Sequence, residues 1–265
     1  MQYILETGNS HKVDIFKKFV ASEQVMELAV PHLHVIDMGD EWVAEALLSQ
    51  SHDLLEFVQY KSEQKPGNET ILSSRGASIC VFDSPLGIVL TPKHLTVLPS
   101  PPPAASSLHT MSVPGSENQL IAWYSSHSDP YKRYSLIQIL THYINKSPDS
   151  FTAEFSLIVS KATVGFHMLL FKQTELIWAH SYDQSDSEDV LYFCLAVLQD
   201  LSVSPLNTHL YFSVRDYDSR HQKVWQDYFR LVLSLEEIVA LPTAQGSLAF
   251  DLKEFALMLG VRLCV

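Results

Sequence analysis

The chain has 265 residues, of which 46% are hydrophobic, with 30 acidic and 18 basic side chains and a net charge of -12. This length and apolar content are enough to bury a core, which excludes global disorder, and the lack of a strongly basic stretch argues against a nucleic-acid surface. The longest apolar runs are far shorter than the roughly 20 residues that span a bilayer, and polar residues interrupt the first 20 residues, so neither a membrane span nor a signal peptide is predicted. We therefore expect a cytoplasmic protein without a nucleic-acid partner.

The first part of the chain has short and mixed patterns. Residues 14–19 and 41–60 have helical hydrophobic spacing, and residues 33–36 favour a short strand. Residues 77–82 and 87–90 are predicted to pair as a hairpin, because the intervening segment contains Pro85 in a position suited to a turn.

A proline-rich segment over residues 99–118 follows and is predicted to hold neither a strand ladder nor a helix. The spacing of apolar residues then predicts a helix over 134–144. The polar segment 147–150 separates this helix from the most regular part of the chain. We therefore divide the chain into an N-terminal half, 1–147, and a C-terminal half, 148–265.

The C-terminal half begins with three short apolar runs joined by polar turns. Residues 155–159, 165–171 and 175–182 predict an antiparallel meander. Ser185 and Glu188 have the spacing of a capping box, after which the apolar spacing predicts a helix of about 15 residues.

The rest of this half alternates between strand and helix. Residues 208–214 predict a strand, 224–232 a helix, 236–241 a strand and 250–259 a terminal helix. The resulting order, β-β-β-α-β-α-β, is shared by ribonuclease-H-like folds and by each half of the actin and sugar-kinase ATPases. This likeness is one of fold and constrains function only weakly.

Several segments also carry a family resemblance. They are the meander end LIWAHSY at 176–182, SEDVLYF at 187–193, Pro205 leading into LYFS at 210–213, the segment 79–95, and the terminal residues 249–252 with 263–264. In these segments the sequence resembles a bacterial (Bacteroidetes) family of unknown function whose members have an actin-like ATPase fold. The resemblance implies an α/β protein of two ribonuclease-H-like halves, each a mixed sheet with flanking helices, and it implies no established activity.

An actin-like fold makes nucleotide binding the first enzymatic hypothesis. Such a site needs a carboxylate and glycines in the first hairpin of each half, so that amides approach phosphates and the carboxylate holds the metal. In the first half the candidates are Asp83 and Gly87, although Pro85 removes one amide. In the second half the hairpin offers Thr163 and no carboxylate. A structural turn is therefore favoured over a phosphate loop.

A third hypothesis comes from the N-terminus. The motif with Gly8, Asn9 and Lys12 resembles the T-G-N-x-x-K loop that contacts nucleotide phosphates in inosine and xanthosine triphosphate pyrophosphatases. It predicts a strand over 3–6 and a helix over 13–19. The downstream acidic motif of that family is not found in the sequence, so a strand-to-helix turn is the alternative reading.

The cysteines and histidines do not add a metal site to these hypotheses. Cys80, Cys194 and Cys264 each sit in an apolar run and are predicted to be buried hydrophobic residues. His32 and His34 form the nearest histidine pair, but neither an HExxH motif nor a facial ligand set is present in the sequence. The acids between 183 and 189 are predicted to cap a helix.

The favoured function is a non-enzymatic cytoplasmic scaffold or protein-interaction module with an unknown protein partner. No catalytic residue, metal or cofactor is predicted for it. The alternative is a nucleotide-binding protein or ATPase that uses ATP with magnesium at Asp83, Gly87 and Thr163. The second alternative is a nucleoside triphosphate pyrophosphatase that uses Gly8, Asn9 and Lys12.

Overall fold

The computed structural model describes residues 15–38, 42–61, 72, 76–82, 85–94, 98–113, 116–124, 132–146, 152–161, 165–183, 186–212, 219–235, 242, 244 and 255–264. The chain divides into two compact units. Unit 1 consists of Met1–Asp83, Asp129–Ile139 and Val239–Val265, and unit 2 of Ser84–Ser128 and Leu140–Ile238. Each unit is thus built from separate segments, whereas the sequence-based division places a single boundary between 147 and 148.

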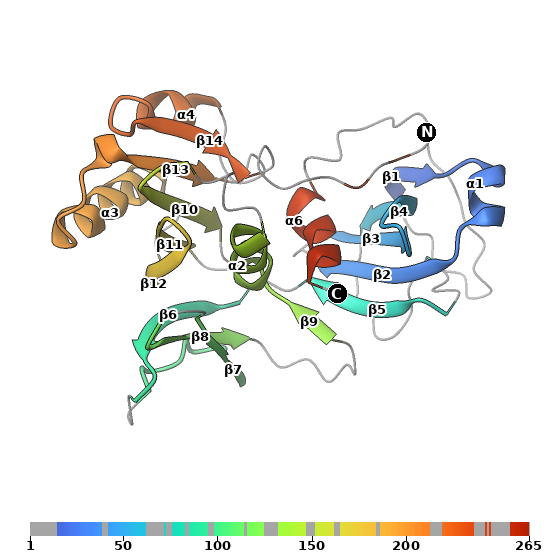
Figure 1. The fold of residues 1–265 in the computed structure, drawn as a ribbon, viewed down its shortest axis with the longest axis horizontal. Helices are drawn as coiled ribbons and strands as arrows, with labels where there is room; N and C mark the ends of the chain where they lie inside the picture. Colours follow the sequence, from blue (N-terminus) through green and yellow to red (C-terminus); the bar gives the residue numbers. More distant parts are fainter. Residues whose placement is uncertain are drawn as a thin grey trace. The chain divides into compact units, whose positions relative to one another are not determined.

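Unit 1 is built on a mixed sheet of six strands in the order β1-β4-β3-β2-β5-β9 (Figure 1). The strands are β1 (Ile15–Val20), β2 (Pro31–Met38), β3 (Trp42–Ser49), β4 (Leu54–Lys61), β5 (Ser78–Phe82) and β9 (Lys132–Tyr134). β2, β3 and β4 form an antiparallel meander, while β5 pairs in parallel with both β2 and β9. Helix α1 (Glu23–Leu28) connects β1 to β2, and α6 (Ala256–Leu259) continues into the 3-10 turn Gly260–Leu263.

The core of unit 1 joins the sheet to the C-terminal segment. Leu33, Ala46 and Phe57 from the sheet form one buried cluster with Phe255 and Leu259. The Phe57 and Phe255 rings lie 4.6 Å apart between centroids. Aromatic pairs at this spacing add to the stabilisation that burial provides.

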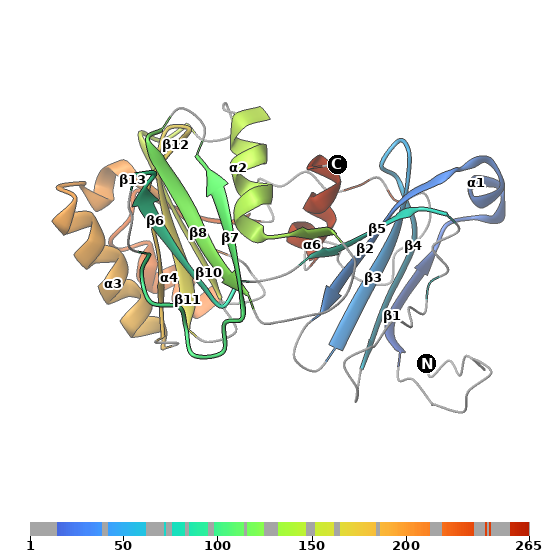
Figure 2. The same ribbon diagram turned by 90° about the horizontal axis from the view of Figure 1, so that it is seen from below.

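Unit 2 contains an eight-stranded sheet in the order β14-β13-β10-β11-β12-β6-β8-β7 (Figure 2). The strands are β6 (Gly87–Pro92), β7 (Ser107–Ser112), β8 (Asn118–Tyr124), β10 (Phe155–Lys161), β11 (Phe166–Lys172), β12 (Glu175–Tyr182), β13 (Thr208–Phe212) and β14 (Leu231–Ser234). β10, β11 and β12 form an antiparallel meander, and β13 and β14 add in parallel on the β10 side.

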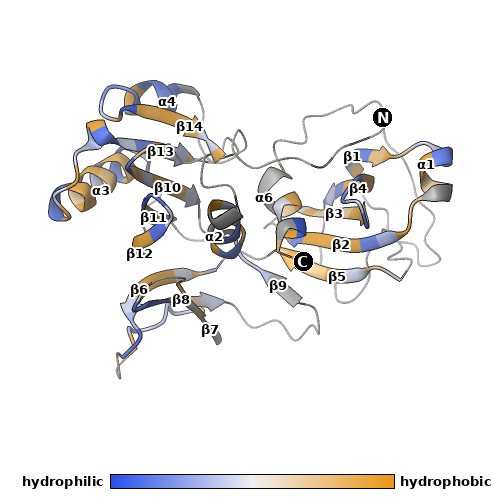
Figure 3. Cartoon of the chain, viewed as in Figure 1, coloured by the Kyte–Doolittle hydropathy of each residue, from blue (hydrophilic) through white to orange (hydrophobic). Residues whose placement is uncertain are grey.

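Two helices of unit 2 pack on the same face of its sheet. They are α3 (Ser187–Asp200) and α4 (Ser219–Trp225). Val190 and Cys194 of α3 and Trp225 of α4 share one buried cluster with Leu157 and Met168 of the strands. In Figure 3 the colour alternates along α3 between hydrophobic and hydrophilic residues, as expected for a helix with one buried face.

Both sheets contain the same arrangement of five strands. In unit 1 the meander β2-β3-β4 is followed by β5 and β9, and in unit 2 the meander β10-β11-β12 is followed by β13 and β14. In each unit the last two strands add in parallel beside the first strand of the meander. The predicted fold class, α/β with two ribonuclease-H-like units, is therefore confirmed.

Several predicted elements are also confirmed. The strand at 33–36 is part of β2, and the helix at 134–144 is α2 (Leu136–Lys146), which crosses the division between the two units. The meander, the helix after it and the strand from 208 are β10 to β12, α3 and β13. The N-cap of α3 is Asp186 and not Ser185 as the capping-box spacing predicts; the Asp186 side chain accepts a hydrogen bond from the Glu188 amide at 2.9 Å.

Two helices predicted in the first part of the chain are wrong. Residues 15–19 of the first fall on β1, and residues 42–49 and 54–60 of the second fall on β3 and β4. Seven of the eight β3 residues are buried, so both of its faces are covered. A strand covered on both faces lacks polar alternation, and its continuous apolar run fits a helix equally well.

Three other predictions need correction. The hairpin of 77–82 with 87–90 is wrong, because β5 pairs with β2 and β9 while β6 pairs with β8 and β12. The proline-rich segment does hold a strand, β7, which lies between Pro103 and Pro114. The helix predicted at 224–232 is wrong, because α4 covers 219–225 and Leu231 starts β14. The strand at 236–241 lies outside the described residues, as does the first part of the helix at 250–259.

Candidate functional site

Among the residues predicted to bind nucleotide, the structure describes Gly87 alone. Asp83, Thr163, Gly8, Asn9 and Lys12 lie outside the described residues. Gly87 is buried at the start of β6, opposite Trp123 of β8. A Cβ at this position would lie 2.8 Å from Cγ of Pro102, closer than real Cβ contacts. The close approach of Pro102 therefore accounts for a glycine here without reference to a phosphate.

The N-terminal motif lacks the predicted helix after it. The pyrophosphatase hypothesis expects a helix over residues 13–19, but residues 15–20 form β1, which pairs antiparallel with β4. That part of the hypothesis is wrong. The alternation of exposed Lys18, buried Phe19 and exposed Val20 has the period of a strand.

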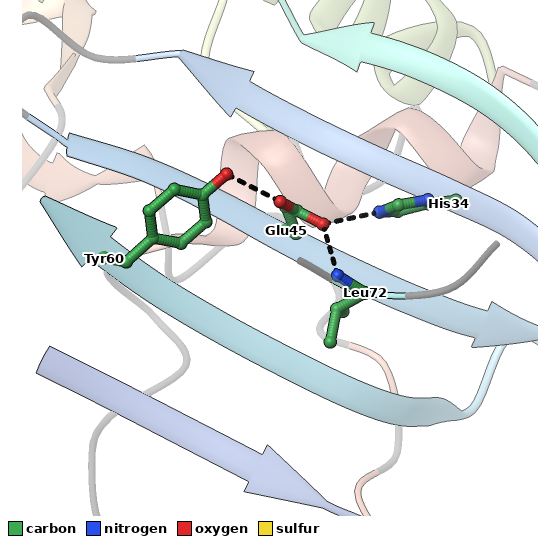
Figure 4. Close-up of polar contacts among 4 residues, drawn as sticks. All are labelled: His34, Glu45, Tyr60 and Leu72. Carbon is green, nitrogen blue, oxygen red and sulfur yellow. Dashed lines mark hydrogen bonds and ion pairs between the residues drawn. The ribbon is translucent and has the colours of Figure 1, made fainter. Parts of the chain in front are cut away.

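Unit 1 contains a buried polar cluster around Glu45 of β3 (Figure 4). Its Oε1 accepts a hydrogen bond from the Tyr60 hydroxyl at 2.7 Å, and its Oε2 accepts from the Leu72 amide at 3.0 Å. Nε2 of His34 lies 3.1 Å from the same Oε2. Burial, and secondly the charge of Glu45, raise the pKa of Tyr60, so its phenol stays protonated and donates.

The Glu45 cluster is closed to ligands. His34 and Glu45 are fully buried, and Leu72 and Tyr60 are nearly so. A buried carboxylate needs several donors to remain in an apolar core, and these three supply them. We therefore assign the cluster to the stability of unit 1.

A second buried polar network lies in unit 2 at His167 of β11. Nε2 of His167 is 2.9 Å from the Pro85 carbonyl oxygen, and Nδ1 is 2.8 Å from Oγ of Ser181. A carbonyl only accepts, so Nε2 carries the proton and Nδ1 accepts from the serine hydroxyl. The same Ser181 Oγ accepts from the Ile88 amide at 2.7 Å.

The His167 network fastens β6 to the meander. β12 and β6 have a single register pair, His180 with Val89, so these side-chain bonds supplement a short ladder. Burial is the main cause that lowers the pKa of His167 to about 4, opposed by its hydrogen bond to Pro85. The distance from Ser181 Oγ to His167 Nδ1 is that of a catalytic nucleophile and its base. His167 is fully buried, however, so its role is structural.

Unlike these networks, the groove between α3 and α4 is open to solvent. It has a volume of about 630 Å³ and is lined, from α3, by Glu188, Leu191, Tyr192 and Leu195, and, from α4 and the turn after it, by Arg220, His221, Val224, Trp225 and Tyr228. We call it the α3–α4 groove. The α3 residues have the spacing i, i+3, i+4, i+7, which places them on one face of that helix.

Large apolar side chains are exposed in the α3–α4 groove. Tyr192 is 66% exposed, Val224 51% and Tyr228 45%. Beneath them Leu191 and Leu195 are partly buried, and Trp225 is fully buried in the unit 2 core. The groove is thus an apolar surface on a rigid base, a combination typical of protein-binding sites.

Sequence reasoning did not find this groove. The predicted helix rests on one apolar run that leaves Tyr192 out: Val190, Leu191, Phe193, Cys194, Val197, Leu198 and Leu201. The available signal was the second stripe, Glu188, Leu191, Tyr192 and Leu195, which is displaced around the helix from the buried one. Cys80 and Cys194 are buried as predicted, while Cys264 is half-buried.

The described part of the chain bears on two functional classes, metal-binding proteins and membrane-spanning proteins. Among those residues, no group of three or more histidines, cysteines or acids is placed to hold a metal ion. No described helix has the length and apolar character needed to cross a bilayer.

Comparison with known proteins gives a family model and several solved structures. The model for the family described as "Protein of unknown function (DUF3822)" matches residues 104–232. A search of curated proteins finds no significant match.

Two solved structures share the fold across most of their length. A protein from Bacteroides thetaiotaomicron with actin-like ATPase fold and unknown function aligns with a TM-score of 0.59 at 11% identity, covering 86% of this chain and 95% of that one. A chain of a PilM–PilN type IV pilus biogenesis complex aligns with a TM-score of 0.50 at 11% identity, covering 89% and 98%. The chain thus has the actin-like ATPase fold, and over residues 104–232 it is similar to the DUF3822 family of unknown function.

Proposed function

We propose that this chain is a non-enzymatic cytoplasmic scaffold or protein-interaction module whose protein partner binds in the α3–α4 groove. The observation that carries the proposal is the exposure of Tyr192, Val224 and Tyr228 around one groove. Covering these side chains removes apolar and aromatic surface from water, which is the main driving force of protein association.

The groove suits a protein better than a small polar ligand. Of the nine described residues that line it, six are apolar or aromatic and two, Glu188 and Arg220, are charged. An enzyme's polar ligand would need several convergent polar groups in the floor of the site. Here the floor is formed by Leu191, Leu195 and Trp225, which offer apolar contacts.

One structure with the same fold supports the proposal by analogy. The PilM–PilN structure is of a complex, so a chain with this fold has a protein partner in that case. At 11% identity the likeness is one of fold. The groove residues of this chain are therefore the direct support.

The proposal is tested by photo-crosslinking in cells. A photo-reactive amino acid at Tyr192 should give a specific protein adduct. The same substitution at Leu206 is the matched control, because Leu206 is also 66% exposed but does not line the groove. An adduct from position 192 that is missing from position 206 supports the proposal. Equal adducts from both positions, or none from position 192, contradict it.

A further inference from the structure

The two sides of the α3–α4 groove carry opposite charge. On the α3 side, Glu188 lines the groove beside exposed Asp186 and Asp189. The sequence of α3 contains no lysine or arginine. On the α4 side, Arg220 lines the groove, with exposed Lys223 one turn further along.

The α4 side is basic at the end where it lines the groove. Asp227, which is also exposed, lies in the turn after α4. Asp227 does not line the groove, whereas Arg220 does. The groove thus has an acidic wall, an apolar floor with exposed aromatic residues, and a basic wall.

We propose that the α3–α4 groove binds the same groove of a second copy of this chain, so that α3 of each copy packs against α4 of the other. The proposal rests on the proposed function and names its partner. In a two-fold contact the same patch faces itself, and the patch must be self-complementary. A groove with one acidic and one basic wall meets this condition, because Glu188 of each copy then faces Arg220 of the other.

The apolar residues fit the same arrangement. Tyr192 stands on the acidic wall, and Val224 and Tyr228 stand on the basic wall. When the walls exchange partners, Tyr192 of one copy covers Val224 and Tyr228 of the other, twice per dimer. Aromatic anchors inside a charged rim are the usual anatomy of a stable interface.

A two-fold contact through this groove is also compatible with the net negative charge of the chain. At -12 per chain, two copies repel each other over most of their surface. Contact is then favoured where the local charges alternate in sign, as they do across this groove. Salt screens both the Glu188–Arg220 contacts and the repulsion between two net negative chains, so wild type and variants are compared at one fixed salt concentration.

The test is a charge exchange, read by sedimentation velocity across a range of protein concentrations. Wild type should dimerise, and Glu188→Arg or Arg220→Glu alone should each raise the dissociation constant at least about tenfold, because each creates two like-charge contacts per dimer. The double variant carries both reversals, so opposite charges face each other again. Its dissociation constant should return to within about threefold of wild type.

Two further variants keep the test independent of folding defects. Asp200→Arg reverses an exposed charge of α3 outside the groove and should leave the dissociation constant unchanged. Tyr192→Asp replaces a side chain that is 66% exposed, so it should fold normally and be monomeric. Each variant is accepted when its circular dichroism and melting temperature match those of wild type.

The outcomes separate this inference from the proposed function. A monomeric wild type, or a double variant no better than either single one, overturns the second copy as partner. If position 192 then still crosslinks to a different protein, the proposed function holds and only its partner is wrong. If position 192 gives no adduct and the chain is monomeric, both fail.

Discussion

Nε2 of His34 on β2 lies 3.1 Å from Oε2 of Glu45 on β3, and both side chains are fully buried. His34 is directly opposite Leu47, while Glu45 is opposite Ile36, so the two polar residues are diagonal neighbours across the antiparallel pair. Side chains in this relation are within reach of each other when they are long. The carboxylate of Glu45 thus lies within the unit 1 sheet, and the groups that donate hydrogen bonds to it contribute to the stability of that sheet.

Replacing Glu45 should therefore destabilise unit 1. Glu45→Gln keeps the size but puts an amide where a carboxylate accepts from Tyr60, Leu72 and His34, so we expect a loss of about 3 kcal/mol in the free energy of unfolding. Tyr60→Phe removes one bond and should cost about 1–2 kcal/mol. Urea denaturation measures both. The exposed Glu23→Gln should stay within about 0.5 kcal/mol of wild type, and an equally small effect at Glu45 contradicts the assignment.

The buried His167 should make stability fall in mild acid. Its pKa is lowered to about 4 in the folded chain, so between about pH 6.5 and pH 4 the unfolded chain binds a proton that the folded chain does not. Stability from this group is complete above pH 6.5 and declines as pH falls. We expect a loss of about 2 kcal/mol between pH 7.5 and pH 5 from His167.

The measurement for His167 compares the pH dependence of two proteins. Urea denaturation of wild type and His167→Gln at both pH values gives the difference in slope, which removes contributions from other groups such as His180 and His209, whose pKa values are also lowered by burial. The variant should lose about 2 kcal/mol less than wild type over this range. Parallel pH profiles for the two proteins contradict the prediction.

The two described glycines with positive φ should respond differently to alanine. Gly76 has φ +83° and open space at the Cβ position, so Gly76→Ala should cost about 1 kcal/mol from backbone strain alone. Gly165 has φ +73°, and a Cβ there would overlap the carbonyl oxygen of Tyr182. Gly165→Ala should therefore cost about 3 kcal/mol or more, because the end of β12 has to move. Thermal and urea denaturation compare the two, and equal losses contradict the steric explanation.

The nucleotide hypotheses make predictions that the scaffold does not. For a scaffold, the melting temperature should not change with ATP, GTP or inosine triphosphate, with or without magnesium. A nucleotide at 100 times its dissociation constant would add about 2.7 kcal/mol, which is readily seen. A magnesium-dependent shift lost in Asp83→Ala would favour the ATPase alternative, and an inosine triphosphate shift lost in Lys12→Ala the pyrophosphatase.

The elements of unit 2 from β10 to β13 were readable from the sequence because their signals are local. The β10–β12 meander alternates with short polar turns, and α3 begins at a polar cap and keeps a helical period. In unit 1 the same reasoning failed at β3 and β4. Burial on both faces of β3 removes the polar alternation that marks a strand, and Glu56 and Gln59 of β4 are three residues apart, a spacing that also fits a helix.

The candidate site was less predictable than the elements that form it. Tyr192 and Val224 are 32 residues apart, and each belongs to a helix that the sequence identified at least in part. Their meeting at one groove depends on how α3 and α4 pack on the sheet through Cys194 and Trp225. No local pattern specifies that packing.

The sequence alone determined the α/β class, the order of elements after residue 150 and the apolar stripe of α3, because these depend on side-chain period and on turn chemistry within a few residues. Tertiary structure decided that β5 and β6 enter different sheets, that Glu45 is enclosed by His34, Tyr60 and Leu72, and that Tyr192 is exposed. These outcomes depend on strand pairing and burial between residues far apart in the chain. The stabilising free energy comes from the contact between two segments, so neither segment specifies it alone.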